Sequence, residues 1–285
     1  MPGTALVLGG GGIAGIAWET GVLVGLAEAG VDLAAADVVV GTSAGSVAGC
    51  LLRSGRSAAS YAAVVAEGEQ EDREHPPVEI PDVEGFRAAM AEALSGPIGS
   101  EQEARARVGA LALQLDASHQ REQVAVFEEL VGGDYWPEGD LRITAVDADT
   151  GAFRAFDRGS GADLATAVAA SCAVPLVYPV VELAGRRWMD GGMRSATNAD
   201  LVEGAERVVV LACNPEPPVS PLGPSLPQAL ERLRRTARVV LIEPDAGSRA
   251  AFGTNSLAHS VRVPCAVAGH AQGLAEAERV RAVWG

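Results

Sequence analysis

Ser43 is the residue best placed for nucleophilic chemistry, because it is the central residue of a G-x-S-x-G run at positions 41–45. The run follows the apolar stretch 37–40 and precedes another apolar stretch, which predicts a tight turn between a strand and a helix. A serine on such a turn has strained backbone angles, and the residues two positions away must be small. Gly41 and Gly45 meet that requirement. The alternative is a serine whose hydroxyl caps the helix.

A glycine-rich turn at residues 9–12 is the second candidate for chemistry. It lies between a predicted strand at 4–8 and a predicted helix at 13–29. Backbone N–H groups at such a turn favour a negative charge, either a phosphate or the oxyanion of an acyl-transfer reaction. Tight packing of the strand against the helix is the simpler explanation of the same glycines.

A dinucleotide site is the main competing interpretation of this turn, because Gly10, Gly12 and Gly15 also fit the pattern G-x-G-x-x-G. Such a site needs an acidic residue at the end of the second strand to bind the ribose. In this sequence Asp37 precedes the second strand and Gly41 ends it, which disfavours nucleotide binding.

Asp190 is the candidate general base, as the first residue of a D-G-G run completed by Gly191 and Gly192. The run ends a short hairpin-like stretch, where a carboxylate can stand at a loop tip. A lone D-G-G is more often an ordinary turn, so the run by itself does not assign a role to Asp190.

A histidine could instead complete a triad in the chain order serine, acid, histidine. His259 and His270 both follow Asp190, but their surroundings are rich in alanine and serine, which is more typical of a solvated or helix-capping histidine. His75 and His119 precede Asp190 and are weaker candidates.

The elements that must position these residues begin with a strand-helix-strand-helix unit over residues 1–55, typical of a parallel sheet covered by helices. Residues 56–140 have helical patterns and no convincing strand, which indicates a helical insertion or cap within a single domain, 1–285. Its acidic, proline-containing stretch 67–84 is expected to be a loop. Further strands are predicted at 141–146, 153–156, 208–212 and 239–242.

Four motifs, taken in order, resemble those of patatin-like phospholipases. The glycine-rich loop and the G-x-S-x-G run are followed by Ala-Ser-x-x-x-Pro at 170–175 and then by the D-G-G, so the resemblance covers residues 9–192. It implies a three-layer α/β/α fold with a mainly parallel central sheet. It also implies hydrolysis of the carboxylic ester bonds of lipids, with no metal and no cofactor.

The same resemblance implies a catalytic dyad. Ser43 would attack the ester carbonyl while Asp190 takes its proton, and the backbone amides of Gly10, Gly11 and Gly12 would hold the oxyanion. The glycines of the other two motifs would support these groups. A carboxylate can act as the base where burial raises its pKa toward the working pH. A binding or regulatory protein of the same fold would carry the four motifs without turnover.

Two departures from the family pattern are visible. Similar proteins usually carry arginine or lysine just before the last glycine of the first loop, and this chain has Ala14. The change removes a cation that could attract a phospholipid phosphate, so a neutral ester or a lysolipid is an equally good candidate substrate. The second departure is Asn198-Ala199-Asp200 where many relatives have Asn-x-Pro, and it is interpreted as structural.

Charge and cysteine content limit the partners and the compartment. The formal net charge is -15 and every basic residue is an arginine, which argues against nucleic acid and against attraction to anionic lipid surfaces. Any contact with a membrane would be transient and apolar, and the expected partner is a lipid or a small ester. With no spanning segment or signal peptide evident, a cytoplasmic protein is expected. The scattered cysteines are expected to be reduced core residues and not metal ligands: Cys50, Cys172, Cys213 and Cys265.

Overall fold

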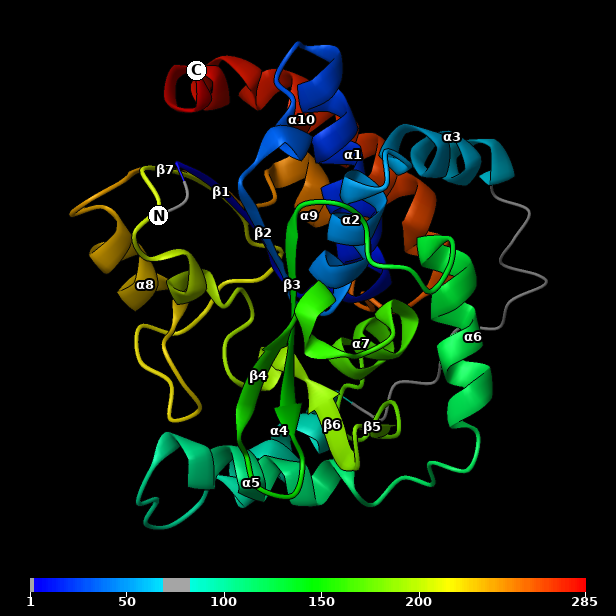
Figure 1. Cartoon of the computed structure of the whole chain (residues 1–285), viewed down its shortest axis with the longest axis vertical. Coiled ribbons are helices and arrows are strands. Elements are labelled where there is room, and N and C mark those ends of the chain that lie inside the picture. Colours follow the sequence, from blue (N-terminus) through cyan, green and yellow to red (C-terminus); the bar gives the residue numbers. More distant parts are fainter. Residues whose placement is uncertain (1–2, 69–82) are drawn as a thin grey trace.

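An eight-stranded sheet forms the centre of the structure, a computed structural model that describes residues 3–68 and 83–285 (Figure 1). The strand order is β5-β6-β3-β2-β1-β7-β8, and β4 pairs with β3 beside this path. The sequence predicted each strand of the sheet except β5 and β6. It did not predict β5, and it indicated β6 only as a hairpin-like stretch. The strands are β1 (Thr4–Leu8), β2 (Val38–Gly41), β3 (Asp140–Asp147), β4 (Phe153–Phe156), β5 (Val181–Leu183), β6 (Arg186–Asp190), β7 (Arg207–Leu211) and β8 (Arg238–Ile242).

The sheet is mainly parallel, as the sequence predicted. The strands β3, β2, β1, β7 and β8 run parallel to one another, β4 and β6 pair antiparallel with β3, and β5 pairs antiparallel with β6. The parallel strands β1, β2 and β7 are short apolar runs in which nearly every residue is buried. This pattern is expected where helices cover both faces of a sheet.

Helices lie on both faces, which confirms the three-layer α/β/α architecture (Figure 1). Alternate strand residues face opposite layers, so that Leu6 and Val39 belong to one apolar cluster and Val7 and Val40 to the other. The first layer contains α1 (Gly12–Glu28), α2 (Ala44–Arg53), α9 (Ala246–Phe252) and α10 (Arg262–Trp284). The second contains α8 (Leu226–Leu233) and the 3-10 turn Ala199–Val202.

The described part of the predicted insertion, 56–140, is helical up to the start of β3. It contains α3 (Ser57–Glu67), α4 (Val83–Ala93), α5 (Glu101–Ala112) and α6 (Gln120–Val131). These helices pack onto the rest of the fold: α3 on α1 and α10, α5 on β3, and α6 on α2 and on α7 (Leu164–Ser171). The predicted loop 67–84, apart from its ends, and His75 lie outside the described residues.

Helices α1 and α10 pack against each other backbone to backbone. Glycines on both helices make the close approach possible: a Cβ atom on Gly21 would lie 2.3 Å from the carbonyl oxygen of Ala266, and one on Gly269 would lie 2.3 Å from that of Trp18. Any larger residue at these positions would force the helices apart. The contact therefore fixes α1, the helix that begins at the glycine-rich loop, against the C-terminal helix.

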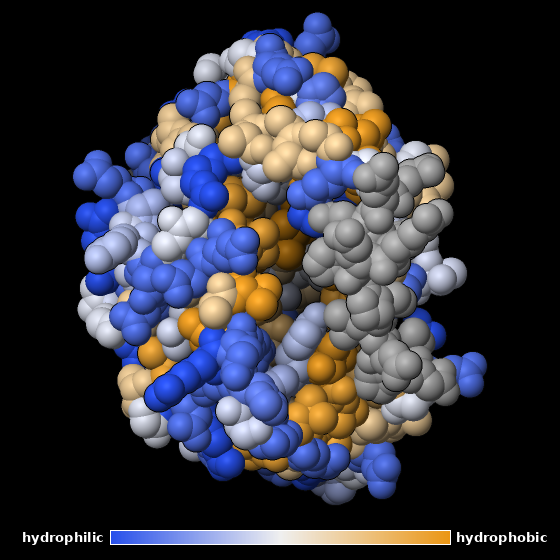
Figure 2. Space-filling model, turned by 90° about the vertical axis from the view of Figure 1, so that its right-hand side faces the viewer, coloured by the Kyte–Doolittle hydropathy of each residue, from blue (hydrophilic) through white to orange (hydrophobic). Residues whose placement is uncertain are grey.

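One face of the molecule is hollowed at its centre. Figure 2 shows this face, which includes the side where α3 and α6 lie, with apolar residues gathered in the hollow and polar residues to its left. Within the described ranges, no helix combines the length and the apolarity that a membrane crossing needs. The cysteines are all buried and free.

Candidate active site

Ser43 occupies a sharp turn between β2 and α2, as the G-x-S-x-G run predicted. Its φ of 52° and ψ of -117° are strained for a residue with a side chain. A Cβ atom on Gly41 would lie 2.5 Å from the carbonyl oxygen of Gly45, and one on Gly45 would lie 2.1 Å from that of Leu8. The Ser43 side chain makes no capping hydrogen bond to α2, so the helix-cap interpretation is wrong.

The backbone of Ser43 is held by the third motif. Its N–H donates to the buried hydroxyl oxygen of Ser171 at 2.9 Å, and its carbonyl oxygen accepts hydrogen bonds from the amide and the hydroxyl of Ser46. Ser171 is the serine of the Ala-Ser-x-x-x-Pro segment. The Ala-Ser-x-x-x-Pro segment therefore has a structural role, because its serine, at the end of α7, stabilises the strained turn.

Sheet topology brings Asp190 to Ser43. Strand β4 occupies one edge of β3 from Ile143 to Val146, so β2 and β6 share the other edge. Gly41, the last residue of β2, pairs with Ile143, and Asp190, the last residue of β6, pairs with Ala145, two positions further along. The antiparallel strand β6 therefore ends where the turn after β2 begins.

Asp190 is a buried carboxyl group beside the Ser43 hydroxyl. Its side chain is 2% exposed, and Ser43 is 8% exposed. Burial raises the pKa of Asp190 to about 6, although hydrogen bonds with the Ser43 side chain and the Gly192 amide act in the opposite direction. The Gly192 N–H donates to Asp190 Oδ1 at 2.7 Å. At neutral pH this carboxylate is mostly ionised and can accept a proton from Ser43.

The glycine-rich loop lies alongside Ser43, at the start of α1. A Cβ atom on Gly10 would lie 3.4 Å from Cβ of Ser43, and Gly12 has the left-handed φ of 65° that favours glycine. The Gly10 N–H already donates to the carbonyl oxygen of Ala196 at 2.7 Å. No acceptor for the N–H groups of Gly11 and Gly12 is found within the described part of the chain. These two amides, at the positive end of α1, are the available anion donors.

Asn198 links the serine turn to the D-G-G loop, a role that sequence reasoning missed. Its Nδ2 donates to Thr42 Oγ1 at 3.0 Å, to the carbonyl oxygen of Gly191 at 3.2 Å and to that of Ser195 at 2.9 Å. Gly191 is packed so tightly that a Cβ atom there would lie 2.2 Å from Thr144 Oγ1. The sequence drew attention to Asn198 only as the first residue of the run that replaces Asn-x-Pro. The groups that Asn198 joins become apparent only in the folded structure.

Ala14 is completely buried, which the sequence did not indicate. Its side chain is 0% exposed, and its N–H donates to the carbonyl oxygen of Ser256 at 2.9 Å. A Cβ atom on Gly12 would lie 2.7 Å from Leu257 Cδ2. The segment after α9 therefore covers the first turn of α1 and leaves no space at position 14 for a long basic side chain.

The histidine alternative finds no support at His270 or His119. His270 Nε2 is 2.8 Å from Glu28 Oε2, and its ring stacks on Tyr61. Because an α-helix rises about 1.5 Å per residue, Glu28 at the end of α1 is roughly 24 Å from Gly12 at its start. The side chain of His119 is 81% exposed. His259 lies in the 3-10 turn His259–Val261, which packs against α10.

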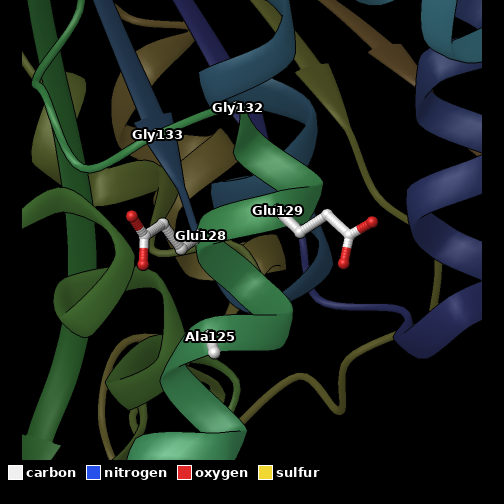
Figure 3. Close-up of a pocket in the computed structure, with 5 residues that line it drawn as sticks. All are labelled: Ala125, Glu128, Glu129, Gly132 and Gly133. Atoms are coloured by element: carbon white, nitrogen blue, oxygen red, sulfur yellow. The ribbon is translucent and has the colours of Figure 1, made fainter.

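Two surface depressions lie beside α6, away from these groups. One is lined by Glu128 and Glu129 together with Gly132 and Gly133, and Figure 3 shows the two glutamate side chains pointing to opposite sides of the helix. The second is lined by residues 133–136 together with Glu128, Arg158, Ala162 and Asp163. Neither contains a residue of the four motifs, so neither is the candidate site.

A family comparison agrees with this arrangement. The sequence model of the patatin-like phospholipase family matches residues 6–202, which contain all four motifs. The chain belongs to this family. Membership replaces the dinucleotide interpretation, which explained the glycine-rich loop alone. The glycine-rich loop, the serine turn and the D-G-G follow directly on β1, β2 and β6.

Two solved structures also match the chain. The crystal structure of the type III effector protein ExoU is 17% identical with a TM-score of 0.39, and the match covers 97% of this chain and 53% of that one. The crystal structure of VipD from Legionella pneumophila is 12% identical with a TM-score of 0.41, and the match covers 97% of this chain and 66% of that one. The chain thus spans about half the length of the ExoU chain. No curated protein matches it.

Proposed function

We propose that this patatin-like protein hydrolyses carboxylic ester bonds of lipids through Ser43 and Asp190. The observation that carries the proposal is a serine on a strained backbone turn beside a buried carboxyl group whose pKa is raised to about 6. An aspartate that served only to hold the turn would contribute more to the stability of the fold if its pKa were lowered. A raised pKa suits a group that must take and return a proton near neutral pH.

The reaction follows from the contacts. Asp190 accepts the hydroxyl proton as Ser43 Oγ bonds to the ester carbonyl carbon, and the carbonyl oxygen becomes an oxyanion held by the amides of Gly11 and Gly12. Collapse of this intermediate breaks the ester bond, and the leaving alcohol takes the proton from Asp190. Water, deprotonated by Asp190, then attacks the acyl-serine, and Ser43 recovers its proton as the fatty acid leaves.

The surface favours substrates that are recognised mainly through apolar contact. The net charge is -15 without any lysine, and position 14 is buried and apolar, so an anionic headgroup gains little electrostatic attraction near the glycine-rich loop. The apolar hollow in Figure 2 is a surface on which an acyl chain or a membrane could make contact transiently. Neutral esters and lysolipids are therefore proposed as substrates alongside phospholipids.

Labelling with a fluorophosphonate probe tests the proposal, because only an activated serine reacts. Wild-type protein should be modified at Ser43, and Ser43→Ala should lose both labelling and hydrolysis of short p-nitrophenyl esters while its melting temperature stays within about 3 °C. Ser54→Ala, at the end of the same helix, is the matched control and should still be labelled. A wild-type protein that is folded but not labelled would instead support the non-catalytic, regulatory interpretation.

A further inference from the structure

Glu19 is a glutamate buried completely inside the protein, in the third turn of α1. Its side chain is 0% exposed. Oε1 accepts a hydrogen bond from the Gly9 N–H at 2.8 Å, the carboxyl group lies beside the Cys213 thiol, and Oε2 has no hydrogen-bond partner among the described residues. Burial raises the pKa of Glu19 well above its usual value, although the contacts with Gly9 and Cys213 act in the opposite direction. Burial thus disfavours the charged form of this carboxyl group.

A buried acid at this position has an energetic cost that calls for an explanation. Removing a carboxyl group from water destabilises the fold unless its hydrogen bonds compensate, and an apolar residue of similar size would pack here without that cost. The neighbours of Glu19 on α1, such as Trp18 and Val22, belong to the apolar cluster beneath the sheet. A contribution to packing alone does not account for a carboxyl group among them.

The contacts of Glu19 lead to both ends of the glycine-rich loop. Gly9, the first residue of the loop, donates its N–H to Glu19 and to the carbonyl oxygen of Leu211, where the distance is 3.1 Å. Cys213, which lies beside the Glu19 carboxyl group, packs against Gly11, where a Cβ atom would lie 2.7 Å from its sulfur. One carboxyl group thus holds the loop where it leaves β1 and supports it below the amide proposed to bind the oxyanion.

We propose that Glu19 is a positioning residue for the oxyanion hole, which it serves by fixing the loop 9–12 through Gly9 and Cys213. The inference rests on the proposed function. Glu19 touches neither the substrate nor Ser43, so it acts only through the placement of the Gly11 and Gly12 amides.

Two variants of Glu19 separate positioning from structural support. Glu19→Gln keeps the acceptor for Gly9 and should retain kcat within about threefold. Glu19→Leu removes the acceptor, and kcat for p-nitrophenyl esters should fall roughly tenfold to a hundredfold with KM changed less than about threefold, because loss of an oxyanion donor affects the transition state most. Its melting temperature should be unchanged or higher, since a desolvated acid has been removed.

Thr20→Val is the matched control. Thr20 neighbours Glu19 on α1, is 4% exposed, and has a hydroxyl without a hydrogen-bond partner among the described residues. The variant should therefore keep both kcat and stability. If wild-type protein is labelled by the fluorophosphonate and Glu19→Leu is labelled at the same rate with the same kcat, the positioning role is wrong and the proposed function stands. If Glu19→Gln loses as much kcat as Glu19→Leu, the proposal that Glu19 acts as the acceptor for the Gly9 N–H is wrong.

Discussion

Asp190→Asn should make the protein more stable at neutral pH while it removes activity. The folded pKa of Asp190 is about 6 against an ordinary value of 3.8, and a shift of roughly two pH units corresponds to about 3 kcal/mol. Because the folded state holds this proton more tightly than the unfolded state, the stability associated with Asp190 is present below pH 4 and is lost as the pH rises through 6. Asparagine has no charge to desolvate, and its Oδ1 can still accept the Gly192 N–H.

Denaturant unfolding at pH 4.5 and pH 8, with ester hydrolysis measured on the same samples, checks this reasoning. The gain in stability of Asp190→Asn over wild type should be about 3 kcal/mol at pH 8 and only about 1 kcal/mol at pH 4.5, and kcat should fall by a factor on the order of a thousand. An equal difference in stability at both pH values would show that the carboxyl group is not desolvated. Retained activity would show that it is not the base.

Asp147→Asn provides the matched control with the opposite sign. This second buried aspartate is held by Arg186 and by the amides of Thr150 and Asp149, and these contacts outweigh burial, so that its pKa is lowered. A group whose pKa is lower in the folded protein than in the unfolded protein stabilises the fold at pH values above its unfolded pKa. This stabilisation is lost as the pH falls. The variant should therefore be less stable than wild type at pH 8, and the deficit should shrink toward pH 3.

Four further outcomes are expected. The kcat/KM for a neutral ester should rise about tenfold per pH unit below pH 6 and level off above it, as a pH–rate profile would show, unless another group is the base. Ser171→Ala should lose about 1–3 kcal/mol of stability in denaturant titration because the Ser43 amide loses its buried acceptor, and kcat should fall with it. Ala14→Arg should destabilise the fold by several kcal/mol, or fail to fold, without the gain in phospholipid turnover that an exposed cation would give. His259→Ala and His270→Ala should keep activity within about tenfold of wild type; a collapse in either variant would favour the triad.

Sequence reasoning located the groups whose roles depend on local structure. The strain at Ser43 and the small residues around it follow from a strand-turn-helix that the apolar pattern and the glycines predict. The pairing of Ser43 with Asp190 came from the order of the motifs, since nothing in the sequence shows that β2 and β6 share an edge of β3.

The remaining site features depend on contacts between residues distant in sequence. The Gly10 N–H donates to the carbonyl oxygen of Ala196, and the segment at Ser256 covers Ala14. No local sequence pattern indicates either contact. Glu19 was not singled out, because a glutamate in an amphipathic helix is expected at the surface. The available indication was an acidic residue within a largely apolar helix, with Ile16, Val22 and Leu23 one turn away along α1.

The contact between α1 and α10 bears on where this domain can be divided. The family match ends at residue 202, before β7, β8 and α10 begin. Yet β7 pairs with β1 along its whole length, and α10 rests on the backbone of α1 through glycines of both helices. A fragment cut at 202 would leave β1 as an open edge strand and would uncover the helix whose first turn carries the proposed oxyanion donors. Expression of this domain, or grafting of its site onto another scaffold, should therefore keep the chain through Trp284.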